Sequence, residues 1–325
     1  MADLCTSSPS KEVITGFGTL SQPKTVTVDC HIDIPWQMTK QGSFDLSLDN
    51  KGKYSQVDFP RMALGGLRAA VFALYLSDGM QDELEDDSLF YIYRQISMVR
   101  QQPKCVIVKN SEEALSCESN SIPIFLGLEG GRLISLPRLG QLGIRYLTIT
   151  HNFNTSWADS STDKPEHHGL TKFGRLVIRE CNKLGIIPDV SHASDDTCWH
   201  VINESLKPVI ASHSACRAIV DHPRNLSDKL IRAIAQTGGV VHIPFARRFI
   251  GPSWTCVADH IDHVVQLVGD KAVGIGSDLD GAEMADGIED VTDWGRVVME
   301  ELSSRGYSDE VIANIAGLNT LRVLG

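Results

Sequence analysis

The sequence predicts an α/β protein, a (β/α)8 TIM-type barrel with additional helices at its C-terminal end. Short apolar runs alternate with segments of helical periodicity, and side chains of metal-binding type follow most of these runs. Runs that are apolar almost throughout are typical of parallel strands buried on both faces. The 325 residues fit one such barrel with insertions. We expect an N-terminal extension over residues 1–24 and a single domain over 25–325.

Eight segments are predicted to be strands because they are short and rich in Val, Ile and Leu. They are residues 25–29, 69–76, 122–128, 145–150, 186–190, 208–211, 239–244 and 272–276. An open, doubly wound sheet is the alternative fold. Polar residues at the C-terminal ends of six of these strands can meet at one point only if the sheet closes, which favours the barrel.

Five segments between the strands place apolar residues at three- and four-residue steps, which predicts helices. They are residues 85–102, 170–185, 194–205, 226–239 and 255–269. Ser194 and Ser227 are suited to cap two of these helices, and Gly185 is suited to end one.

Other segments differ from this alternation. The tail, residues 290–325, predicts two or three helices that close one end of the barrel. The polar segments 36–60 and 152–169 are expected to be long loops on the face that carries the ligand-type side chains.

The composition excludes several classes of protein. The net charge is −11, and no Lys/Arg cluster is long enough for a phosphate-binding surface, so we expect no nucleic-acid partner. The eight cysteines include no CxxC pair, which favours free thiols in a reducing compartment. No segment has the pattern of a signal peptide or a membrane span, so we expect a cytoplasmic protein without a membrane segment.

His31 and Asp33 follow the first predicted strand and lie two residues apart. In an extended segment such residues point to the same side, so both can bind one cation. Glu129 follows the third strand and is followed by two glycines. Taken alone, a glutamate in this position is more often an acidic residue at a helix N-terminus or a salt-bridged loop residue than a metal ligand. Beside His31 and Asp33 it becomes a candidate for a carboxylate that bridges two metal ions.

His192 and His213 follow successive strands, 21 residues apart. Taken alone, a histidine in either position is as often a hydrogen-bonded core residue as a metal ligand. Two histidines in equivalent positions favour a shared ion, which would have His192, His213 and Glu129 as ligands. Imidazole and carboxylate ligands suit zinc best, and manganese, cobalt or iron are able to replace it.

His151 and Asp278 also follow strands, and either could be a further ligand. Alternatively, His151 could donate a hydrogen bond to an oxyanion, and Asp278 could pass a proton to a leaving amine. The simpler interpretation of Asp278 is a turn carboxylate in the DLDG sequence, although Asp280 suits that role better. Arg217 and Arg224 are either exposed loop residues or clamps for a substrate carboxylate.

Taken together, these residues and their neighbours resemble the renal or membrane dipeptidase family of the amidohydrolase superfamily. The resemblance runs from about residue 26 to the C-terminal end, and its motifs together are highly specific. They are DCHIDIPW (29–36), GLEGG (127–131), YLTITHN (146–152), GLTKFGRLVIRECNKLGIIPDVSH (169–192), ASHSACR (211–217), HPRN (222–225), GSDLDG (276–281) and GLNTLRVL (317–324).

The resemblance implies a barrel with two zinc ions per chain, bridged by a glutamate. The implied ligands of one ion are His31, Asp33 and Glu129, and those of the other are Glu129, His192 and His213. The implied substrate-binding residues are His151, Arg224 and Asp278, and the implied catalytic residues are Asp278, His151 and Glu129. Cys30, Ile32 and Leu318 stand where the family commonly has other residues, and none of the three is at a ligand position.

We therefore expect a zinc-dependent dipeptidase in which a hydroxide between the two ions attacks the peptide bond of a dipeptide. Arg224 would bind the C-terminal carboxylate of that substrate. The alternatives are a related amidohydrolase acting on N-acyl amino acids, lactams or cyclic amides, and a metal-binding scaffold without turnover. A scaffold is disfavoured because a structural zinc site needs no additional proton carrier. Homodimers are common among such proteins, so we expect one here.

Overall fold

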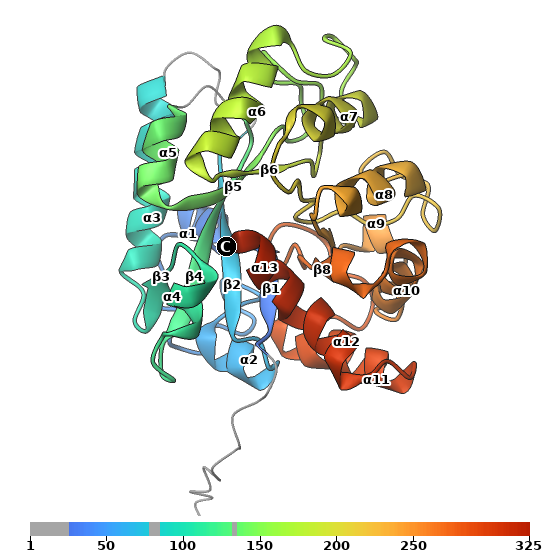
Figure 1. Cartoon of the computed structure of the whole chain (residues 1–325). Helices are drawn as coiled ribbons and strands as arrows, with labels where there is room; N and C mark the ends of the chain where they lie inside the picture. Colours follow the sequence, from blue (N-terminus) through green and yellow to red (C-terminus); the bar gives the residue numbers. More distant parts are fainter. Residues whose placement is uncertain (1–25, 78–84, 132–134) are drawn as a thin grey trace, which may run out of the picture.

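The chain forms a curled parallel sheet with helices around its outside (Figure 1). The computed structural model describes residues 26–77, 85–131 and 135–325. The predicted N-terminal extension, residues 1–24, lies outside the described residues. Two parallel sheets make up the strand framework. The larger pairs its main strands in the order β1 (Val28–Ile32), β2 (Ala69–Tyr75), β4 (Ile122–Glu129), β5 (Ile144–Thr148) and β6 (Ile187–Asp189), and the smaller pairs β7 (Val241–Ile243) with β8 (Val273–Ile275).

Three parallel bridges join these two sheets into a closed barrel. Asp189 pairs with Ile210, and Ala211 pairs with Val241, so residues 210–211 form the strand between β6 and β7. Ile32 at the end of β1 pairs with Leu279 beyond β8, which closes the ring. The predicted barrel is therefore confirmed, and the open sheet is wrong.

The later strands are one to three residues shorter than predicted, and larger differences occur at the first strand and at an additional one. The first strand runs from Val28 to Ile32 rather than over 25–29, so His31 lies within it. Asp29 looks like a strand end in the sequence, but its buried carboxylate accepts hydrogen bonds from the backbone N–H of His31 and Ser277, at 3.1 and 2.9 Å. The short strand β3 (Cys105–Ile107) pairs with β4 and was not predicted, because three half-exposed residues give too little apolar pattern.

The five main helices all lie within their predicted ranges. They are α3 (Glu85–Arg100), α6 (Lys172–Leu184), α7 (Asp195–Glu204), α8 (Asp228–Gln236) and α10 (Cys256–Val268). The Ser194 and Ser227 side chains cap α7 and α8 by accepting backbone N–H bonds, as predicted. Gly185 ends α6 in the left-handed conformation, at φ +70°. Shorter helices are α1 (Ile34–Gln41), α2 (Phe59–Leu64), α4 (Ser111–Leu115), α5 (Leu136–Leu142) and α9 (Arg247–Ile250).

The C-terminal tail is helical, as predicted, and includes two π-helical turns. It contains η2 (Val291–Asp293), η3 (Arg296–Glu300), α11 (Glu301–Ser304), α12 (Asp309–Ala313), η4 (Asn314–Leu318) and α13 (Asn319–Leu324). A Cβ at Gly317 would lie 1.9 Å from the carbonyl oxygen of Val26, so only glycine allows η4 to approach the start of β1 this closely. The tail therefore covers the barrel at the N-terminal end of β1.

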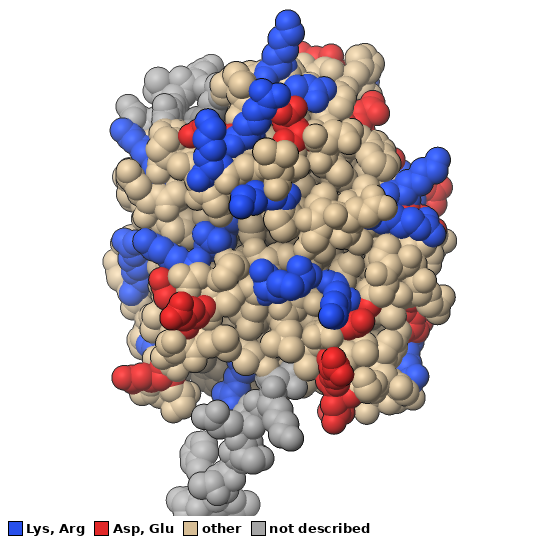
Figure 2. Space-filling model, in the orientation of Figure 1, with Lys and Arg blue, Asp and Glu red and all other residues tan. Residues whose placement is uncertain are grey.

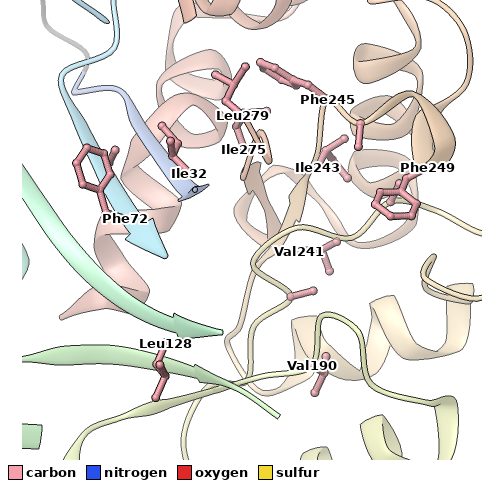
Figure 3. Packing of buried hydrophobic residues seen from close by; sticks show 14 of the residues in the cluster. Ile32, Phe72, Leu128, Val190, Val241, Ile243, Phe245, Phe249, Ile275 and Leu279 are labelled. Carbon is pink, nitrogen blue, oxygen red and sulfur yellow. The ribbon is translucent and has the colours of Figure 1, made fainter. Parts of the chain in front are cut away.

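Apolar side chains fill the space between the sheet and the helices. Figure 3 shows part of this core, with side chains from opposite sides of the barrel, namely Ile32, Phe72, Leu128, Val241, Ile243 and Ile275. The described cysteines have free thiols, in agreement with the prediction.

The surface of the described residues carries scattered charge. On the face drawn in Figure 2, Lys and Arg side chains lie among acidic side chains and uncharged surface and do not merge into one continuous band. Within the described residues, none of the helices has both the length and the apolar character that crossing a bilayer requires.

Candidate functional site

A cavity of about 530 Å³ opens at the C-terminal ends of the barrel strands. Active sites of such barrels lie at this end of the sheet. Asn152, Phe153 and Thr162 line the cavity from the predicted loop 152–169. The prediction of a loop over 36–60 is wrong at both ends, where α1 and α2 overlap it, and Trp36 lines the cavity from α1. The remaining lining residues are Asp33, Tyr75, Glu129, His151, His192, His222, Arg224, Arg248, Phe249, Asp278, Gly281 and Ala282.

The carboxylate of Glu129 is at the centre of the buried polar cluster beneath this cavity. Its Oε1 lies 3.0 Å from His192 Nε2, 3.4 Å from His213 Nε2 and 3.8 Å from His31 Nε2. The Nε2 atoms of His192 and His213 are 2.9 Å apart. Asp33 Oδ2 lies 3.6 Å from His31 Nε2. The structure thus brings together all five side chains that the sequence predicts as ligands.

The backbone at the strand ends directs these side chains inward. Glu129 is the last residue of β4, and Gly130 turns the chain away from it at φ +96°. His192 and Asp278 have φ values of +70° and +65°, in the left-handed region that residues other than glycine seldom occupy. Such conformations persist where the surrounding structure fixes them, and they cluster at functional sites.

Tyr146 fixes the orientation of the His31 ring. Its hydroxyl donates to the carbonyl oxygen of Cys30 at 3.2 Å, so it accepts the Nδ1–H of His31 at 2.8 Å. In the neutral form of His31 the lone pair is then on Nε2, which faces Asp33 and Glu129. Gly127 makes room for this arrangement, because a Cβ there would lie 2.2 Å from the tyrosine ring.

Asp189 and Ser212 hold the His213 ring in the same manner. Asp189 accepts the Ser212 hydroxyl at 2.6 Å and the Ser212 backbone N–H at 2.8 Å. Because the hydroxyl proton is used in this way, Ser212 Oγ accepts the Nδ1–H of His213 at 2.9 Å. The Nε2 lone pair of His213 therefore points toward Glu129.

Burial and mutual repulsion shift the charge states of this cluster. Burial raises the pKa of Glu129 and of Asp278, and the neighbouring Asp33 raises the pKa of Asp278 further. Burial also lowers the pKa of His192 and His213 well below the usual value, which keeps both rings neutral. Burial opposes protonation of His31 as well, but Asp33 and Glu129 outweigh it and raise the pKa of His31 to about 10.

The cluster fits divalent metal ions. His31 Nε2 and His192 Nδ1 are buried without a hydrogen-bond partner, which is uncommon for polar atoms in a folded interior. The ligand atoms of His31, Asp33 and Glu129 all lie within 4.8 Å of one another, and so do those of Glu129, His151 and His192. Neutral imidazoles and carboxylates suit zinc, with other first-row metals as substitutes.

His151 and Asp278 lie at the edge of the same cluster. The His151 ring centre is 4.4 Å from that of His192, and its Nδ1 is 3.3 Å from the Tyr75 hydroxyl. Asp278 forms a third potential ligand group with His31 and His213. Both residues are therefore placed for either predicted role, as a ligand or as a group that assists the reaction.

Asp280 has the structural role that the sequence favours for it. Its carboxylate accepts the backbone N–H of Gln56 at 2.7 Å and the hydroxyl of Ser55. Asp280 thus ties the loop after α1 to the turn that carries Asp278.

The two candidate arginines have different environments. Arg217 forms a bidentate ion pair with Asp195, at 2.8 and 2.7 Å, outside the cavity lining. Arg224 is buried in the cavity wall, and its guanidinium makes only 3.4 Å contacts with Ser214 Oγ and the His213 carbonyl. Its Nε has no partner among the described residues. Burial lowers the pKa of Arg224 to about 10, although Asp278 and Glu129 oppose the shift, so the group is charged at neutral pH.

Several residues of the site were not predicted. Tyr146 and Asp189 were included in predicted strands without a role, although a charged residue within the apolar run IIPDV was a usable signal. His222 lines the cavity from a loop, whereas Arg248 and Phe249 line it from the short helix α9, and neither segment gave a strand-end pattern.

The chain matches the family model described as membrane dipeptidase (Peptidase family M19) over residues 21–325. It is 32% identical to "Dipeptidase verJ" from Clonostachys rogersoniana, covering 91% of this chain and 83% of that protein. It is 33% identical to human "Dipeptidase 3", covering 91% of this chain but 64% of that longer protein.

Solved structures share the fold. A metallopeptidase from Rhodobacter sphaeroides, solved with a phosphinate mimic of the dipeptide L-Ala-D-Ala, superposes with a TM-score of 0.83 at 24% identity, covering 92% of this chain and 99% of that one. The probable dipeptidase PvdM from Pseudomonas aeruginosa superposes with a TM-score of 0.82 at 25% identity, covering 93% of this chain and 95% of that one.

The hydrogen bond beneath His31 gives a test of the metal site. Replacing Tyr146→Phe removes the acceptor of His31 Nδ1–H, so the ring loses its fixed orientation. We expect the zinc affinity to fall by about tenfold to a hundredfold, measured by competition with a chromogenic chelator. Tyr91→Phe, at a partly buried position on α3, is the control and should bind zinc as the unmodified protein does. Equal affinity in all three proteins would contradict the role of Tyr146.

Proposed function

Because the chain belongs to the membrane dipeptidase family (Peptidase family M19), we propose that it hydrolyses the peptide bond of dipeptides with two zinc ions. His31, Asp33 and Glu129 would hold one ion, and Glu129, His192 and His213 the other. One observation carries the proposal: a single carboxylate oxygen of Glu129 lies within 4 Å of three imidazole nitrogens, and a buried arginine without a carboxylate partner lines the same cavity.

Two zinc ions bound there would make a water molecule nucleophilic at neutral pH and polarise the carbonyl group of the substrate. The residues of the chain supply the other parts of the reaction. His151 lines the cavity beside His192 and would donate a hydrogen bond to the oxyanion of the tetrahedral intermediate. Asp278 lies within reach of both ligand sets and would receive the proton of the attacking water and transfer it to the leaving amine.

Arg224 would select the substrate by its C-terminal carboxylate. A buried guanidinium forms its strongest hydrogen bonds with a carboxylate, because the two groups match in charge and planar geometry. The acidic residues Asp33 and Asp278 lie elsewhere in the cavity lining and suit the amino group of the substrate. A substrate peptide whose amino group and C-terminal carboxylate are both bound in this way has about two residues.

The proposal as a whole is tested by metal analysis together with a substrate panel. We expect two tightly bound metal ions per chain, loss of activity on chelation and recovery with zinc. L-L and L-D dipeptides should be hydrolysed faster than N-acetyl amino acids or lactams, because the latter lack the free amino group that Asp33 and Asp278 would bind. Fewer than two bound ions, or no dipeptide hydrolysis with zinc restored, would refute the proposal. Preferential turnover of an N-acyl amino acid or a lactam would support the alternative amidohydrolase.

The proton-transfer role of Asp278 is tested by Asp278→Asn. The amide cannot take up a proton from the nucleophile, so we expect turnover to fall by about 10²–10⁴-fold while the metal content stays the same. Asp280→Asn, two residues along the same turn, is the control, and its turnover should fall by much less. Turnover in Asp278→Asn close to that of the unmodified enzyme would exclude this role.

The role of Arg224 is tested by Arg224→Gln. Loss of a buried charge partner for the substrate carboxylate should lower kcat/KM by about a hundredfold. Arg217→Gln is the matched control, because Arg217 already pairs with Asp195 away from the cavity. The unmodified enzyme should prefer a dipeptide to its C-terminal amide, and Arg224→Gln should lose this preference. The same preference in the variant would show that another group binds the carboxylate.

A further inference from the structure

The cavity contains a second arginine, Arg248, to which the proposed hydrolysis assigns no role. Its guanidinium carbon lies 5.6 Å from the centre of the Phe249 ring, and that of Arg224 lies 5.1 Å from the same ring. Arg224 is buried, whereas Arg248 is exposed to solvent. Two cationic groups at different depths in the cavity therefore share one aromatic ring.

The charge of Arg248 is available to a ligand. Its neighbour on α9, Arg247, forms an ion pair with Asp286. Arg247 does not line the main cavity and lines only a second hollow beside it. Arg248 lines both the hollow and the main cavity, and it has no ion pair or hydrogen bond with any described residue. Glu283 also lines the hollow, but it forms no ion pair with Arg248.

His222 adds a hydrogen-bond donor to the same part of the cavity. Its Nδ1 accepts the backbone N–H of Arg224 at 3.1 Å, so the neutral ring has its proton on Nε2. The ring lies edge-on to Phe249, with 5.1 Å between the ring centres. Burial and the charges of Arg248 and Arg224 lower the pKa of His222, which keeps the ring neutral at pH 7.

We propose that Arg248 and His222 form a second anion-binding subsite, which selects dipeptides whose C-terminal residue is Asp or Glu. The inference rests on the proposed function, because Arg224 must bind the α-carboxylate for the adjacent side chain to lie near Phe249. In Asp and Glu the two carboxylates are only a few bonds apart, which suits two guanidinium groups beside one ring. Acidic side chains on the N-terminal residue are disfavoured, because that residue lies toward Asp33 and Asp278.

Dipeptides with a neutral C-terminal side chain remain substrates in this scheme. Arg248 is exposed, so water solvates its charge when no carboxylate is bound, and no buried charge is left unpaired. The subsite therefore changes the ranking of dipeptides rather than the reaction itself.

The experiment compares kcat/KM for Ala-Glu, Ala-Gln and Glu-Ala in the zinc-loaded enzyme and in three variants. We expect the unmodified enzyme to prefer Ala-Glu over Ala-Gln by about tenfold, mainly through KM, and to disfavour Glu-Ala. Arg248→Gln should bring the Ala-Glu to Ala-Gln ratio close to one, and Arg248→Lys should retain part of it. Arg247→Gln is the matched control and should keep the full ratio. The preference should also weaken as the salt concentration rises.

The outcomes separate this inference from the proposed function. Hydrolysis of Ala-Gln without any preference for Ala-Glu would overturn the subsite alone, and so would a preference that survives in Arg248→Gln. An equal preference for Glu-Ala would overturn the assigned position of the acidic side chain. If the zinc-loaded enzyme hydrolyses none of the three dipeptides, both the proposed function and the subsite are refuted.

Discussion

The site depends on one electrostatic constraint, namely that several buried carboxylates meet at one end of the barrel. The ligand atoms of His31, Asp33 and Glu129 lie within 4.8 Å of one another, and Asp278 is part of the same cluster. Two like charges 4 Å apart repel by about 4 kcal/mol at an effective dielectric constant of 20. Without a metal ion, protons must reduce this repulsion, which is why the pKa of His31 rises to about 10 despite burial. The cluster thus favours cations between its ligand sets.

The same polar groups that orient the ligands also hold the barrel together. Asp29 accepts hydrogen bonds from His31 in β1, from Ser277 beyond β8 and from the indole of Trp294 in the tail. Asp189 joins β6 to the segment that carries Ser212 and His213. The barrel therefore closes at the positions where the ligands leave the strands.

The sequence predicts the strands and the five ligand positions because both depend on local pattern. An apolar run followed by His, Asp or Glu is visible in the chain itself, and the barrel brings the strand ends together. The hydrogen bonds that orient the ligands cannot be predicted in this way, because partners such as Tyr146 and His31 are 115 residues apart in the sequence. The choice between Arg217 and Arg224 likewise depends on Asp195, which pairs with only one of them in the fold.

Within the proposed function, the distribution of charge along the cavity determines how a dipeptide binds. Asp33 and Asp278 line the cavity beside the ligand cluster, whereas Arg224 and Arg248 lie against the Phe249 ring. A zwitterionic dipeptide bound with its amino group toward the acids and its carboxylate toward Arg224 places its peptide bond between them, near Glu129. The reverse orientation brings a carboxylate against Asp33 and Asp278 and moves it away from Arg224, so it is disfavoured. A longer peptide in the productive orientation would extend past Arg224 and leave that buried cation without its anion, which is more costly than losing a solvent-exposed contact. The charge pattern therefore determines both the direction and the length of the substrate.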